Sequence, residues 1–185
     1  MDKTQLQKDL VSGDYEVTPE GLYFPREKLR ARGVWTYAKR GEPFEEVPNL
    51  IVDEGLDYML GAALGAQTPV TSWYIAIFTG DVAVQASWTA ANFVSNATEG
   101  TAYVAASRPA WTPAAVSGQG ISSFASKAEF VSSGVMTVRG AALLSGSVKS
   151  STSGTLYSAA RFNNDKGIDA TEALDVGYRV ELSSA

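Results

Sequence analysis

Three acidic side chains lie close together near the C-terminus, in the stretch NNDKGIDATEALD. They are Asp165, Asp169 and Glu172, and clustered carboxylates are ligands that calcium prefers in proteins. Their spacing matches no EF-hand loop, and Lys166 lies among them. A solvated turn accounts for the same residues, so the sequence leaves open whether a cation binds near Asp165 and Asp169.

A second acidic group, Asp53, Glu54 and Asp57, lies in IVDEGLDYMLGAALG. A pair of carboxylates can serve as acid and base in glycoside hydrolysis. Acids at the start of a helix more commonly cap it and interact favourably with its dipole, and Asp53 is placed as an N-cap. We therefore expect these residues to begin a helix rather than to form a catalytic site.

The chain of 185 residues contains no cysteine and no histidine. This composition excludes disulfides, cysteine nucleophiles, Ser-His and Cys-His pairs and the common zinc sites. The sequence also has no phosphate-binding loop and no dinucleotide fingerprint. We expect a protein that is not an enzyme, with no cofactor and no metal.

The formal net charge of -5 is mild and gives no support for binding to duplex nucleic acid, which needs a concentrated basic face. No apolar run approaches the roughly 20 residues that span a bilayer. The first residues, MDKTQLQKDLVSGDY, are polar and mixed in charge, unlike a signal peptide. Neither nucleic acid nor a membrane is an expected partner.

Charged residues are concentrated at the N-terminus. Residues 1–32 hold 12 of the 35 charged residues, whereas residues 66–160 hold only 7. The first region shows no long helical or alternating period and ends in the basic stretch REKLRAR, so we interpret it as an extended arm. It is either a solvated linker or a docking arm that becomes ordered on an acidic partner surface.

The docking interpretation names a set of partner-binding residues. Basic side chains would meet acidic groups of the partner, and apolar or aromatic side chains would anchor the contact. The predicted partner-binding residues are Leu22, Tyr23, Phe24, Lys28, Arg30, Arg32, Trp35 and Tyr37.

Two elements are predicted before residue 66. The stretch GVWTYAKRGEPFEEVPN predicts a hairpin over residues 33–48, because apolar alternation surrounds a Gly-Glu-Pro turn signal. A helix is predicted near residues 53–65, and its apolar face is expected to pack on a sheet. That face consists of Leu56, Leu60, Ala63 and Leu64.

Strands and turns dominate from Thr71 onward. SWYIAIFTG predicts a strand covered on both faces, and TAYVAASRPAW, ISSFASKAEFV, GVMTVRGAALLSG, GTLYSAARF and ALDVGYRVELS predict further strands. The stretch NNDKG is among the turn signals between them, and a loop with a short helix near residues 88–93 is expected between 82 and 100. Strands in series, without intervening helices, indicate antiparallel pairing.

The predicted fold is therefore mainly β. It is an antiparallel β-sandwich, jelly-roll-like or alternatively immunoglobulin-like, with one short helix and an extended N-terminal arm. The predicted division is an arm over residues 1–32 and a sandwich domain over residues 33–185, which includes the hairpin and the helix.

The four tryptophans have two possible uses. Trp73 lies in a core-like run and is expected to be buried, whereas Trp35, Trp88 and Trp111 lie in less regular contexts. Exposed aromatic rings can stack on sugars or anchor an interface, but packing in a core or interface is the more common use.

The order of segments resembles a recurrent group of small structural proteins of tailed bacteriophages. The segments are PNLIVDEGLDYMLGAALG, WYIAIFTGD, GAALLSG, GTLYSAARF and ALDVGYRVELS, and the resemblance spans residues 48–184. In that group a strand that begins with asparagine leads into a short helix, and an aromatic-apolar strand, a loop with a tryptophan and a terminal series of strands follow. These motifs are patterns of packing rather than of chemistry.

The resemblance implies a virion protein, and some members of the group look like capsid decoration or cement proteins. We expect a structural protein on the outer surface of the capsid, made in the host cytoplasm, that binds the major capsid protein and forms a dimer or trimer. The alternative is a tail or tail-fibre component with receptor- or sugar-binding loops. Residues 1–32 lie outside the shared region.

Overall fold

The structure is a computed structural model that describes residues 15–17, 19, 23–25 and 29–184. The chain divides into two compact units, one formed by residues 32–181 and the other by residues 1–31 with 182–185. In the smaller unit, strand β1 (Tyr15–Val17) pairs antiparallel with β2 (Tyr23–Pro25).

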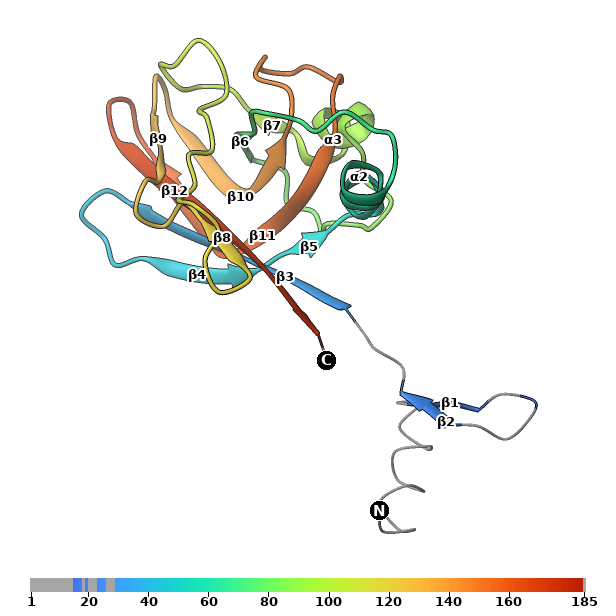
Figure 1. The fold of residues 1–185 in the computed structure, drawn as a ribbon. Coiled ribbons are helices and arrows are strands. Elements are labelled where there is room, and N and C mark those ends of the chain that lie inside the picture. Colours follow the sequence, from blue (N-terminus) through green and yellow to red (C-terminus); the bar gives the residue numbers. More distant parts are fainter. Residues whose placement is uncertain (1–14, 18, 20–22, 26–28, 185) are drawn as a thin grey trace. The chain divides into compact units, whose positions relative to one another are not determined.

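Two five-stranded antiparallel sheets form the sandwich (Figure 1). The β10 sheet has the order β5 (Leu50–Ile51), β11 (Leu156–Ile168), β10 (Met136–Leu144), β6 (Tyr74–Phe78) and β7 (Glu99–Gly100). The β12 sheet has the order β4 (Glu45–Pro48), β3 (Leu29–Lys39), β12 (Ala173–Ser184) and β8 (Gly120–Ser122), and β9 (Ala128–Val131) also pairs with β12. The predicted mainly β, antiparallel sandwich is confirmed.

Aromatic side chains fill the space between the two sheets. The ring of Tyr37 on β3 stacks on Phe162 of β11, with 3.7 Å between the ring centres. Tyr178 on β12 lies 4.5 Å from Trp35 and 6.4 Å from Tyr157 of β11. These rings bury large apolar areas from both sheets, which is the main favourable contribution to such a core.

Two of the predicted strand patterns are confirmed. β3 and β4 form the expected hairpin, with Trp35 opposite Val47. On β6, all four residues from Ile75 to Phe78 are buried, as the continuous apolar run predicted. A strand can be buried on both faces only if a second layer covers its outer side.

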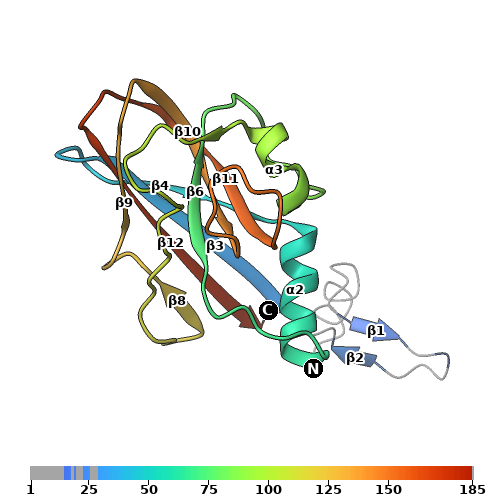
Figure 2. The ribbon, with the colours of Figure 1, turned by 90° about the horizontal axis from the view of Figure 1, so that it is seen from above.

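That second layer is helix α3 (Ala90–Ala97), which lies on the same side of the β10 sheet in Figure 2 as the helix that follows β5. Phe93 of α3 and the preceding Trp88 each lie 6.3 Å from the ring of Phe78. The short helix predicted near residues 88–93 therefore exists, displaced by a few residues. Its apolar side closes a second cluster of buried residues on the β10 sheet.

Helix α2 (Asp53–Leu64) confirms the predicted element but not the predicted face. Leu56, Leu60 and Leu64, which were expected to face the sheet, are 41%, 61% and 85% exposed. The buried residue of α2 is Gly55, where an added Cβ would collide with the carbonyl oxygen of Tyr157 on β11. The absence of a side chain at Gly55 lets the helix approach β11 closely, and the leucines are turned away.

Two further expectations are wrong. The stretch 101–111 makes only isolated bridges, at Tyr103 and Ala110, instead of a strand. The stretch NNDKG, expected to be a turn, lies inside β11, where residues 162–165 oppose the single β10 residue Arg139. A large bulge favours the same residues, Asn and Asp, as a turn, because both structures depart from regular strand geometry.

Candidate binding surfaces

The predicted partner-binding residues have different environments. Leu22 and Lys28 lie outside the described residues, and Tyr23 and Phe24 belong to β2 with their side chains outside the description. Arg30 and Arg32 are exposed at the start of β3.

Trp35 and Tyr37 do not lie on the surface of the protein. Both side chains are completely buried between the sheets. A buried ring has no surface to offer to a partner, so these two aromatic residues are not partner anchors; β3 is a core strand in which every residue from Trp35 to Ala38 is buried.

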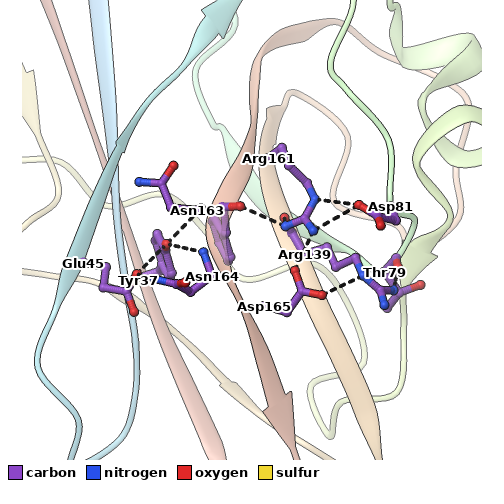
Figure 3. A network of polar contacts seen from close by, with 10 residues as sticks. Tyr37, Glu45, Thr79, Asp81, Arg139, Arg161, Asn163, Asn164 and Asp165 are labelled. Atoms are coloured by element: carbon purple, nitrogen blue, oxygen red, sulfur yellow. Dashed lines mark hydrogen bonds and ion pairs between the residues drawn. The ribbon is translucent and has the colours of Figure 1, made fainter.

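Tyr37 has a structural task at the β11 bulge (Figure 3). Its hydroxyl accepts hydrogen bonds from the backbone N–H groups of Asn163 and Asn164, at 3.1 and 3.4 Å, and donates to Glu45 of β4 at 2.9 Å. A bulge leaves backbone N–H groups without ladder partners, and an unpaired buried N–H is costly. The Tyr37 hydroxyl thus supplies a hydrogen-bond acceptor for the N–H groups of the bulge, and it links the two sheets.

Glu45 is held as a carboxylate in this network. Lys166 lies 2.8 Å from it, and the side-chain amide of Asn164 donates to it at 2.7 Å. The hydrogen bonds from Lys166 first, and then from Asn164, lower the pKa of Glu45 from 4.5 to about 2. The lysine side chain is largely buried and also pairs with Glu42, so its charge is used within the folded protein.

Asp165 is likewise committed to arginines rather than to a cation site. Its two oxygens lie 2.6 Å from Arg161 and 2.9 Å from Arg139 (Figure 3). Burial raises the pKa of Asp165, but the hydrogen bonds and charges of the two arginines outweigh burial, and the pKa is lowered overall. The Asp169 backbone N–H instead donates to the carboxylate of Glu172. Within the described residues, no group of three or more acidic side chains is arranged to hold a metal ion.

Glu54 of the second acidic group joins three elements. Its carboxylate accepts backbone N–H bonds from Leu156 of β11 at 2.6 Å and from Ala90, the first residue of α3, at 2.8 Å. An acidic group near a helix N-terminus is favourable, and here the same carboxylate also accepts the N–H bond of the first residue of β11. The prediction of Asp53 as N-cap is wrong: the N-cap is Val52, and Asp53 is the first residue of α2, where it still lies favourably in the helix dipole. Both Asp53 and Asp57 are exposed.

A buried ion pair that sequence reasoning missed fixes the loops on one end of the sandwich. Arg108 and Glu99 are fully buried and form two parallel hydrogen bonds of 2.8 and 2.7 Å. Arg108 also donates to the carbonyl oxygens of Gly146 and Ser151. The Ser-Arg-Pro context gave no signal for burial, because the partner carboxylate comes from a separate segment.

Among the described residues, two surfaces group exposed or half-buried apolar side chains on neighbouring positions. The first, called the leucine row, consists of Leu56, Leu60 and Leu64 on α2, flanked by the exposed acids Asp53 and Asp57. Large apolar side chains on one helix face are usually covered, either by the protein itself or by a partner.

The second surface is an aromatic hollow. Trp73, expected to be buried, is only half-buried, and so is Trp111. Both line a small hollow together with Tyr58 of α2 and Tyr157 of β11. Trp35 and Trp88, by contrast, are core residues.

Comparison of the chain with models of protein families finds no match, and comparison with curated proteins finds no relative. No helix among the described residues is long and apolar enough to cross a membrane.

Proposed function

We propose that the protein is a non-enzymatic structural protein of a bacteriophage virion, specifically a capsid decoration protein that binds the assembled shell and stabilises it. The observation that carries the proposal is the leucine row, because one face of an ordered helix presents three leucines to water. The resemblance of residues 48–184 to phage structural proteins supplies the class of partner, which is the major capsid protein.

The chemistry of the leucine row describes the surface that it would meet. Full burial of a leucine is worth about 1.5–3 kcal/mol, so three leucines can support a specific contact. The flanking carboxylates of Asp53 and Asp57 favour a partner patch that is apolar with a basic border. A protein that binds only the assembled shell shifts the assembly equilibrium toward it, which is how a decoration protein stabilises a capsid.

The use of the acidic residues supports a structural rather than a catalytic role. Glu54 is bound by two backbone N–H groups, and Asp165 is bound by two arginines. General acid–base catalysis needs a carboxyl group that can exchange a proton with a substrate, whereas one oxygen of Glu54 accepts both N–H bonds and each oxygen of Asp165 is paired with an arginine. We further propose a dimer or trimer on the outer surface of the capsid, made in the host cytoplasm.

The test is the binding of purified protein to capsids that lack it, with Leu60→Asp compared with Val135→Asp. Leu60 and Val135 are 61% and 81% exposed, so neither substitution buries a charge and we expect both variants to fold. We expect Leu60→Asp to bind capsids at least about tenfold more weakly, and Val135→Asp to bind as the wild type does. The temperature at which capsids release their contents, with and without the protein, measures the stabilisation.

Two outcomes would contradict the proposal in different ways. Wild-type protein that does not bind capsids would exclude the shell as partner. Equal capsid binding by Leu60→Asp and the wild type would place the attachment surface elsewhere on the protein.

The alternative function is a tail or tail-fibre component with receptor- or sugar-binding loops. The half-buried Trp73 and Trp111 favour it, because partly exposed indoles are common in sugar sites. The copy number in the virion separates the two functions: a decoration protein is present in proportion to the shell subunits, whereas a tail component is present in few copies.

A further inference from the structure

The aromatic hollow has two neighbouring parts that share lining residues. The apolar part, of about 150 Å³, is lined by aromatic and aliphatic side chains, among them Tyr58, Trp73, Trp111 and Tyr157. The hydroxyl-bordered part, of about 450 Å³, shares both tryptophans and is bordered by residues 70–74 and 110–113. All of these residues belong to the larger unit.

The two tryptophans are fixed in position. The indole N–H of Trp111 donates to the carbonyl oxygen of Tyr178 at 3.2 Å. The backbone N–H of Trp111 donates to the backbone carbonyl oxygen of Trp73 at 2.7 Å. The ring of Trp73 meets the rings of Tyr58 and Tyr157 edge-on, at 5.1 and 5.6 Å. A site with rings held in this way loses little conformational entropy when a ligand binds.

The lining is electrically neutral. Among the described residues, no aspartate, glutamate, lysine or arginine borders either part of the hollow, and the polar side chains of the hydroxyl-bordered part include the hydroxyls of Thr71, Ser72 and Thr112. A ligand that fits this surface has an apolar face for the indoles, hydroxyl groups at its edge and no net charge. A pyranose ring has these properties, since its C–H face packs on an aromatic ring while its hydroxyls bond to polar groups.

We propose that the aromatic hollow binds a neutral acetylated sugar, an N-acetylhexosamine unit of a polysaccharide. The sugar ring stacks on Trp111 and Trp73 in the hydroxyl-bordered part, and the acetamido methyl group packs in the apolar part. A methyl group suits the apolar part, because the exposed lining of that part is almost entirely apolar. The inference stands apart from the proposed capsid attachment, which uses the leucine row.

The experiment measures binding of two trisaccharides to the isolated full-length protein by NMR titration. Chitotriose carries an acetamido group on each ring, and cellotriose is the matched control with hydroxyl groups in those positions. We expect chitotriose to shift the indole N–H signals of Trp73 and Trp111, while the buried Trp35 and Trp88 stay unchanged. Cellotriose should bind at least about tenfold more weakly, because it leaves the apolar part of the hollow unfilled.

Substitutions at Trp111 test the stacking. Trp111→Ala should weaken chitotriose binding by at least about tenfold, and Trp111→Phe, which keeps an aromatic face, should recover part of it. Val135→Asp, on an exposed residue outside the hollow's lining, should bind chitotriose as the wild type does.

Three results would overturn the inference, and all can be read from folded protein. They are the absence of shifts at both hollow tryptophans of the wild type, equal binding of chitotriose and cellotriose, and full binding by Trp111→Ala. Because no capsid is present in this assay, its result is independent of whether the protein binds the shell.

Discussion

At the scale of single residues, the hydroxyl group of Tyr37 stabilises the β11 bulge. Tyr37→Phe removes the acceptor of two backbone N–H groups and the donor to Glu45. We expect a loss of about 1–3 kcal/mol in the free energy of unfolding, measured by urea titration.

Tyr103 provides the matched control for this substitution. Its hydroxyl is also buried but has no hydrogen-bond partner within the described part of the chain. Tyr103→Phe should therefore leave stability unchanged or raise it slightly. If the two Phe variants were equally stable, the Tyr37 hydroxyl would have no special role at the bulge.

The charge of Glu45 predicts a specific response to acid. Its pKa in the folded protein, about 2, is below its ordinary value of 4.5. A carboxyl group with a lowered pKa stabilises the folded state above its unfolded pKa, and this stabilisation is lost as the pH falls toward the folded pKa. We expect the free energy of unfolding to decrease between pH 4.5 and pH 2.

The variant Glu45→Gln isolates this contribution. The glutamine cannot titrate, so the decrease over the same pH range should be smaller in the variant, and the two proteins should approach equal stability near pH 2. The pKa values of Glu129 and Glu172 are also lowered, but their contributions are common to both proteins. Parallel stability curves for the two proteins would contradict the assignment.

At the scale of elements, the close contact of α2 with β11 decides which helix face is free. Gly55→Ala places a methyl group against the Tyr157 carbonyl oxygen, and backbone there cannot move aside easily. We expect a loss of about 1–3 kcal/mol by urea titration, despite the better helix propensity of alanine.

Gly61→Ala is the control in the same helix. A Cβ at Gly61 meets only the Gln67 side chain: its terminal Oε1 can rotate away, and its Cβ, at 3.3 Å, must give by only a few tenths of an ångström. Its expected effect is a gain of up to about 1 kcal/mol, the helix propensity difference between alanine and glycine. Equal effects at the two glycines would mean that α2 does not need its close approach to β11.

At the scale of the whole molecule, the division at residues 31 and 32 permits a test of the arm. A protein without residues 1–31 retains the buried aromatic core between the sheets and most of β3. We expect it to keep the circular dichroism spectrum of a β protein but to bind capsids more weakly than the full chain, because Arg30 and the basic residues before it are lost.

The salt dependence of capsid binding identifies what the arm contributes. Charge contacts at a rim mainly accelerate association and weaken as salt is added. If the shortened protein binds capsids as tightly as the full chain at every salt concentration, the arm is only a tether, and the leucine row alone provides the attachment.

The sequence by itself determined the elements whose evidence is local. The apolar run of β6, the alternation and turn of the β3–β4 hairpin and the boundaries of α2 all follow from short-range patterns. Together they define an antiparallel, mainly β protein, since strands in series without helices have few other ways to cover their apolar faces.

Only the tertiary structure decided which face each element presents and where each charge goes. The leucines of α2 have the spacing of a buried face, but Gly55 allows a closer approach on the opposite side, and distance to β11 decided the orientation. The sequence around Asp165 is typical of a solvated turn, whereas in the structure Asp165 pairs with Arg139 and Arg161. Local patterns specify period and propensity, whereas burial and pairing depend on residues far away in the chain, which come together only in the folded protein.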